Sequence, residues 1–87
     1  MPTTCPIPLP EERQALWNAL EAVYASKSKA VTYATAYASQ GLAMLMREEG
    51  DNALVLQAQA VLAHIIHWRG PEARATRTAL KSFIDLP

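Results

Sequence analysis

The fold of this chain is decided by two uncharged stretches of equal length, AVTYATAYASQGLAMLM at Ala30–Met46 and NALVLQAQAVLAHIIHW at Asn52–Trp68. The polar segment REEGD at Arg47–Asp51 separates them and is typical of one helix end followed by a new helix start. About seventeen residues in an α-helix extend roughly 26 Å. The two stretches therefore predict an antiparallel helical hairpin with too little polar surface to stand uncovered in water.

Length and composition indicate one small helical domain. The chain has 87 residues, few aromatic residues and only three glycines, and its frequent alanines favour helix. Eight basic residues balance eight acidic ones, which argues against a general electrostatic attraction to nucleic acid or to an anionic membrane. The single cysteine, Cys5, permits no intramolecular disulfide and fits a reducing compartment, so we expect a cytoplasmic protein. Neither uncharged stretch is apolar enough to predict a membrane span.

These observations predict an all-α fold, a small four-helix domain built on a central antiparallel helical hairpin. The helices are expected at about residues 10–26, 28–49, 52–69 and 71–85, within a domain that covers 10–87. Residues 1–9 contain three prolines, and this predicts an extended, Pro-rich N-terminal arm, because each proline removes an amide donor and fixes φ.

Local signals mark the ends of these helices. Pro10, followed by two glutamates, suits the start of the first helix. Gly50 suits the left-handed position after the second helix, and Asp51 or Asn52 suits the N-cap of the third. Gly70, followed by proline, is expected to break the chain before the fourth helix.

A line of small residues follows one side of the predicted second helix. Close approach of a second helix is favoured by such a line, because backbones can then pack without large intervening side chains. Gly41 lowers helix propensity by about 1 kcal/mol relative to alanine, which is easier to explain if something packs against it. The line is a candidate for self-association, and the sequence leaves open whether it serves the hairpin or a dimer. It comprises Ala34, Ala38, Gly41 and Leu45.

Other side chains on the same two helices are candidates for contact with a partner protein. Tyrosine and methionine suit protein interfaces because they cover area at a low cost in ordering. The weaker face of the third helix is polar only in patches and carries no charge. The candidate partner-binding residues are Tyr33, Tyr37, Met44, Met46, Gln57, His64 and His67.

The sequence contains no recognisable catalytic, cofactor or metal site. His64 and His67 are three residues apart, whereas two imidazoles that share a metal on a helix are usually four apart. No second cluster of ligands accompanies them, so ordinary surface histidines are expected here. No nucleophile elbow or phosphate-binding loop occurs. We expect no enzyme activity and no cofactor.

Nucleic acid binding is the alternative function. The third predicted helix, the break at Gly70 and the fourth predicted helix could form a helix-turn-helix motif, with basic side chains available to a groove and to phosphates. The zero net charge argues against this, and the basic edge of the fourth helix could simply be solvated. The residues concerned are Arg69, Arg74, Arg77 and Lys81.

The favoured interpretation is a non-catalytic module for protein–protein interaction. We expect a small cytoplasmic regulator or inhibitor that binds another protein, of unknown identity, and forms a homodimer. A dimer would bury the apolar surface that two short flanking helices leave uncovered, and two-fold pairs are the commonest closed assemblies.

Overall fold

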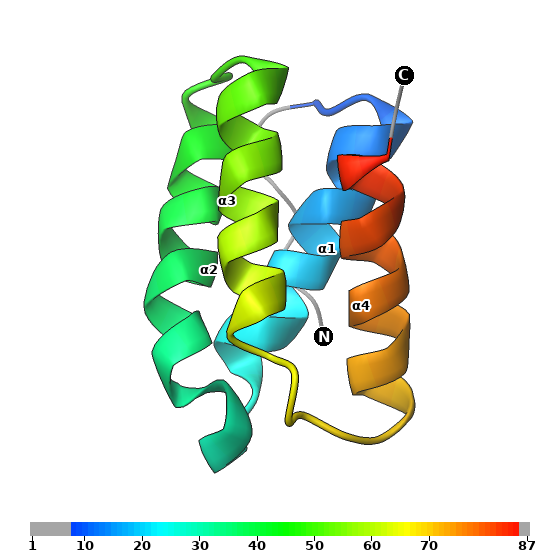
Figure 1. The fold of residues 1–87 in the computed structure, drawn as a ribbon. Helices are drawn as coiled ribbons and strands as arrows, with labels where there is room; N and C mark the ends of the chain where they lie inside the picture. The colour runs from blue at the N-terminus through cyan, green and yellow to red at the C-terminus, as the bar shows by residue number, and fades with distance from the viewer. Residues whose placement is uncertain (1–7, 86–87) are drawn as a thin grey trace.

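The computed structural model describes residues 8–85, and four α-helices account for most of them (Figure 1). The elements are α1 (Glu11–Ala25), a short 3₁₀ helix η1 (Lys29–Val31), α2 (Thr32–Met46), α3 (Asp51–Ala63) and α4 (Pro71–Ile84). No strand occurs in the described part of the chain. The prediction of an all-α, four-helix fold is confirmed. The predicted arm at residues 1–9 falls mainly outside the described residues.

The helices form a closed ring in which each packs against two neighbours. α1 packs against α2 and α4, and α3 also packs against α2 and α4. Successive helices run in opposite directions, as the change of colour along the chain shows in Figure 1. The predicted hairpin of α2 and α3 is therefore one packed pair among four, and α1 contributes as much to the core as either member of that pair.

The core lies along the axis of this ring. Its largest fully buried side chains come from all four helices, from η1 and from the segment between α3 and α4, so no single pair of helices holds the domain together. Burying a leucine or isoleucine stabilises a fold by about 1.5–3 kcal/mol. These side chains are Leu16, Leu20, Val23, Val31, Leu45, Leu54, Val61, Ile65 and Leu80.

The small residues of α2 pack inside the chain. Ala34 and Ala38 are fully buried, and Gly41 faces Leu20 of α1 and Gln57 of α3. A Cβ atom at position 41 would lie 2.8 Å from Leu20 Cδ1 and 3.3 Å from Gln57 Cγ. Only glycine therefore fits here without displacing a core side chain.

Helix α2 ends in a Schellman motif whose left-handed residue is Glu48. The Glu49 amide donates to the Met44 carbonyl and the Glu48 amide donates to the Leu45 carbonyl, both at 3.1 Å, which is the hydrogen-bond pattern of this motif. Glu48 has φ 56°, the one positive φ outside glycine among the described residues. The expectation that Gly50 takes this position is wrong, because α2 ends at Met46, three residues before its expected end at residue 49. Gly50 instead has φ −66° and is the N-cap of α3.

Helix α3 ends at Ala63, six residues before its expected end at Arg69. The amides of His64 and Ile65 bond to carbonyls three residues back rather than four, so the last turn tightens and the chain leaves the helix. Ile65 and Trp68 are buried in the core, as the periodicity of the sequence predicts. Both lie, however, in the loop that follows α3. The expected start of α4 at Pro71, after a break at Gly70, is confirmed.

Gly41→Leu should destabilise the fold by about 3 kcal/mol, because an added side chain must displace Leu20 within a packed core. Gly50→Ala is the matched control, since no atom lies within 4 Å of a Cβ atom there, and it should cost no more than about 1 kcal/mol, through the poorer N-cap that alanine makes. Urea denaturation followed by circular dichroism measures both. Equal stability of the two variants would contradict the close packing at Gly41.

Glu48→Gly should stabilise the protein by about 1 kcal/mol, because glycine adopts a positive φ without the clash that a Cβ atom causes. Glu48→Ala removes the same charge and keeps the clash, so it should give no such gain. The difference in urea midpoint between the two variants isolates the backbone contribution. A gain for alanine equal to that for glycine would assign the effect to charge instead.

Candidate functional site

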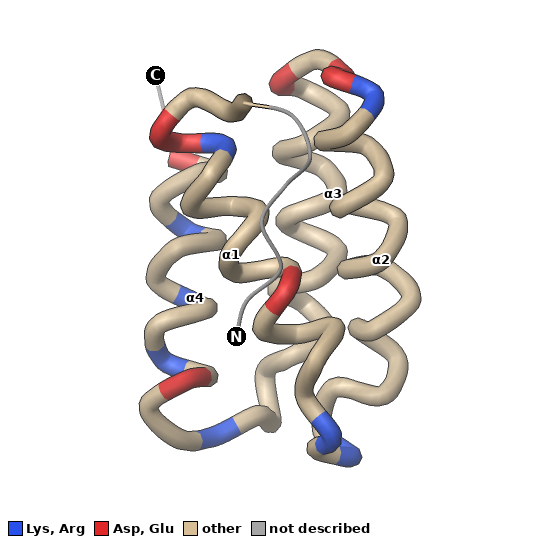
Figure 2. The backbone as a smooth tube through the Cα atoms, turned by 180° about the vertical axis from the view of Figure 1, so that it is seen from behind, with Lys and Arg blue, Asp and Glu red and all other residues tan. Residues whose placement is uncertain are grey.

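Charge is distributed unevenly over the four helices. Figure 2 shows Lys, Arg, Asp and Glu on α1, on α4 and at the helix ends, whereas α2 and α3 carry none over most of their length. The chain has no charged residue between Ala30 and Met46 or between Asn52 and Trp68. Because α2 and α3 lie side by side, the bundle has one side without charge.

Large apolar side chains are exposed on that side. Tyr33 is 81% exposed and Leu56 is 67% exposed. Helical spacing directs both outward where α2 meets α3. We call this surface the neutral face. It comprises Tyr33, Tyr37, Gln40, Leu56, Ala60 and His64.

Three interactions fix the geometry of the neutral face. The side-chain amide of Gln57 in α3 donates to the backbone carbonyl of Tyr37 in α2 at 2.7 Å. The rings of Tyr37 and His64 stack with their centroids 4.7 Å apart. The His64 Nδ1 atom lies 2.7 Å from the Ala60 carbonyl oxygen, and since a carbonyl only accepts, Nδ1 carries the hydrogen. Rings held in this way lose little freedom when a partner binds.

The predicted partner-binding residues do not all gather on this face. Tyr33, Tyr37 and His64 do. Met44 is buried, with 7% of its surface exposed, and helical spacing places the exposed Met46 about 140° around α2 from Tyr33. The remaining two residues differ again: the Gln57 side chain joins α2 to α3, and His67 is exposed in the segment that follows α3.

The four residues proposed for self-association are buried within the chain. Ala34, Ala38 and Leu45 have no exposed surface, and Gly41 faces Leu20. The sequence left open whether this line of residues serves an internal contact or a dimer. In this fold it makes the internal contact, mainly with α1, and is not available to a second molecule.

Leu56 is the most exposed apolar side chain of the neutral face after Tyr33, and the sequence analysis did not select it. The sequence did contain a signal for Leu56 as a contact residue. Leu56 lies on the side of its helix opposite to the stripe of Leu54, Ala58 and Val61. A leucine on the side of a helix that points away from the core of the bundle indicates a contact surface. It does so better than a methionine at the edge of the buried stripe.

The four basic candidates for nucleic acid binding do not form one free surface. Arg69, Arg74 and Lys81 are exposed. The Arg77 guanidinium, however, donates to the carbonyls of Trp68 at 2.6 Å and Ile65 at 3.3 Å. It thereby gives the Trp68 carbonyl a donor and adds a second donor to the Ile65 carbonyl, which also accepts from the Trp68 amide at 3.0 Å.

The relative orientation of α3 and α4 also differs from a helix-turn-helix motif. Figure 1 shows the two helices side by side and running in opposite directions, and they pack against each other. In a helix-turn-helix motif the two helices cross at about 90–120° so that the second can enter a groove. The nucleic acid alternative is left with exposed basic side chains as its only support.

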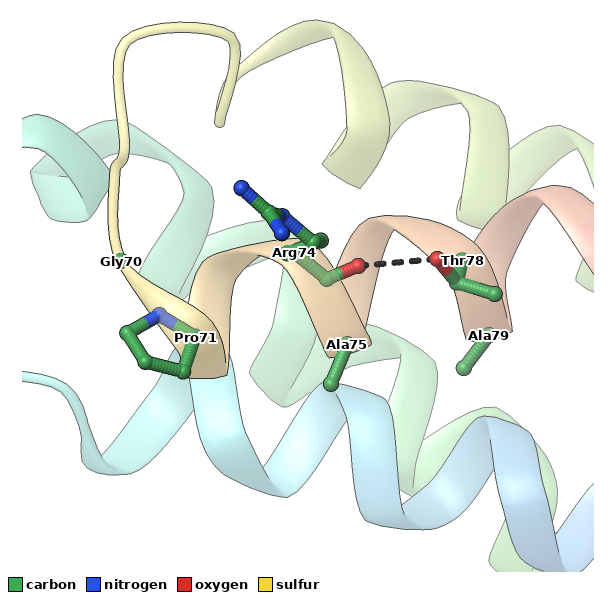
Figure 3. Close-up of a pocket in the computed structure, with 6 residues that line it drawn as sticks. All are labelled: Gly70, Pro71, Arg74, Ala75, Thr78 and Ala79. Atoms are coloured by element: carbon green, nitrogen blue, oxygen red, sulfur yellow. Dashed lines mark hydrogen bonds between the residues drawn. The ribbon is translucent and has the colours of Figure 1, made fainter.

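Two of the hollows on the described surface differ in their lining: the first has Arg74 as its one charged side chain, and the second is lined by Glu12, Arg13, Glu48 and Asp51. The first follows α4 and is lined by small side chains, with Ala75 directed toward α1 and Arg74 directed away from it (Figure 3). The Thr78 hydroxyl there donates to the Arg74 carbonyl at 3.0 Å. The second lies at the opposite end of the bundle, near Val55 and Phe83, where Arg13 pairs with Asp51.

Residues 8–85 contain no group of three or more histidine, cysteine, aspartate or glutamate side chains arranged to hold a metal ion. Within the same range no helix has both the length and the apolar character needed to cross a bilayer.

Comparison with known proteins gives no relative. The chain matches no family model, no curated protein and no solved structure.

Arg77→Met should lower the free energy of unfolding by about 1–3 kcal/mol, because it removes the donor at 2.6 Å from the partly buried Trp68 carbonyl. Arg74→Met is the matched control on the same helix, and its exposed position predicts a change of less than about 0.5 kcal/mol. Urea denaturation compares the two. If both variants lose the same stability, the loss reflects the charge of α4 and not the bonds from Arg77.

Proposed function

We propose that this chain is a non-catalytic module that binds another protein through the neutral face. The observation that carries this proposal is the exposure of Tyr33 and Leu56 on a side of the bundle that has no charge. Protein interfaces are depleted of charged residues at their centre and enriched in tyrosine. A contiguous apolar patch on a small protein marks an interaction site more often than an unused surface.

The composition of the neutral face suits a protein partner better than a small molecule. Gln40 and His64 supply polar groups beside the tyrosines, and the Tyr37 ring is already stacked on His64. The two hollows described above lie elsewhere, and the exposed rings of this face offer contact area. A broad surface that is held in place before binding suits the similarly broad surface of another folded protein.

A small cytoplasmic regulator or inhibitor is the form of function we propose for such a module. A chain of 87 residues that covers a partner's surface excludes other ligands from that surface. The cytoplasmic location follows from the single cysteine and stays a prediction. Binding of nucleic acid by α4 is the alternative, supported by the exposure of Arg74 and Lys81.

Photocrosslinking in cells of the native host tests the proposed function. A photoreactive phenylalanine analogue at Tyr33 should capture a specific protein, because that side chain lies at the proposed interface. The matched control is the same analogue at Tyr24, which is 52% exposed on α1 and should capture nothing specific. Leu56→Glu should abolish the capture at position 33 while the circular dichroism spectrum stays unchanged.

Two results would contradict this proposal. One is equal capture of the same proteins from positions 24 and 33, which would mean that the neutral face is not the binding surface. The other is capture of DNA or RNA by the analogue at Lys81 with none of protein at Tyr33, which would favour the alternative function of α4.

A further inference from the structure

Opposite charges lie at the two ends of the neutral face. Lys27 and Lys29 precede α2 at one end. The connection between α2 and α3 forms the other end, where one arginine is outnumbered by three carboxylates, those of Glu48, Glu49 and Asp51. Figure 2 shows blue alone at the lower end of α2, and red together with one blue segment at its upper end. Each bundle therefore carries a neutral surface with a basic end and an acidic end.

Some of these charges have no ion-pair partner within the chain. Asp51 pairs with Arg13, and Glu49 pairs with Arg47. Glu48, Lys27 and Lys29 are exposed and take part in no ion pair within the described residues. They are free to pair with charges on another molecule.

We infer that the partner with the best fit to this face is a second copy of the chain, turned by 180° about a two-fold axis perpendicular to α2 and α3. This rotation brings the basic end of each copy against the acidic end of the other, and it brings the two uncharged centres together. A parallel pair would instead place like charges together at both ends. The two-fold contact is self-complementary, so every favourable pair occurs twice.

The available area matches what such a pair requires. The accessible surface of the chain is 5617 Å². One side of a four-sided bundle with two ends is about a sixth of this, roughly 900 Å², and each partner in a standard interface buries about 800 Å². Leu56, near the middle of α3, would lie near the centre of the contact, where water is excluded, and Tyr33, the second residue of α2, would lie toward its basic end.

This inference rests on the proposed function, because it uses the same face, and it adds a regulatory consequence. A copy seated on the neutral face excludes the other protein. Self-association therefore competes with partner binding and stores the module in an inactive form at high concentration. Dilution, or a partner that binds more tightly, releases it.

Exchange of charge between the two ends tests the orientation. Lys29→Glu makes like charges meet in an antiparallel homodimer, and so does Glu48→Lys. Each variant alone should dissociate at about ten-fold higher concentration than wild type, measured by sedimentation equilibrium from roughly micromolar to millimolar protein. An equimolar mixture of the two variants should recover wild-type affinity, because opposite charges meet again at both ends of the heterodimer.

Two controls separate orientation from loss of fold. Lys81→Glu changes an exposed charge on α4 and should leave self-association unchanged. Tyr33→Glu should prevent association both alone and when combined with the charge exchange, whereas Tyr24→Glu should not. Both positions of the exchange are exposed, so an unchanged circular dichroism spectrum is expected for every variant.

Failure of the inference differs from failure of the proposed function. Wild-type protein that stays monomeric over the whole concentration range would overturn the inference, as would a mixture of the two charge variants that associates no better than either alone. Specific capture from Tyr33 in the host would still support the proposed function in that case. Strong self-association without such capture would support the inference and remove the second partner.

Discussion

The close approach of α2 to α1 at Gly41 is the contact on which the rest of the bundle depends. Leu20 reaches the backbone of α2 there because no side chain intervenes. The neighbouring Ala34 and Ala38 are also buried and extend the short separation along α2. Since α2 presents its small residues to the interior, its larger rings have no place inside, and Tyr33 is left on the surface.

This arrangement explains why an uncharged helix can belong to a small bundle and still expose apolar surface. The core is filled mainly from other elements, by large side chains such as Leu16, Leu54 and Leu80. α2 contributes little side-chain volume to the core, and its small residues allow α1 to approach its backbone closely. Charge is confined to α1, α4 and the connections, which keeps the molecule polar on the sides that face away from the α2–α3 pair.

Sequence periodicity predicted the number and type of the helices because it records which residues face inward. It could not predict how the helices end. Ile65 and Trp68 continue the inward stripe of α3, yet they are buried from a loop whose carbonyls accept hydrogen bonds from Arg77, twelve and nine residues away. Glu48 takes a backbone conformation usually left to glycine, although Gly50 is two residues away. In both places a tertiary contact or a turn overrides the local preference.

The candidate surface was predicted in part for the same reason. Tyr33, Tyr37 and His64 were selected for their residue type and lie together on the neutral face. Met44 was selected on the same ground and is buried, because it lies at the edge of the stripe that packs inward.

The hydrogen bonds from Arg77 also affect the cooperativity of unfolding. They tie α4 to the end of α3, and α4 also closes the ring against α1, so α4 cannot detach without releasing the loop and opening the core. The domain should therefore lose its structure as a single unit, with no stable three-helix intermediate on the way.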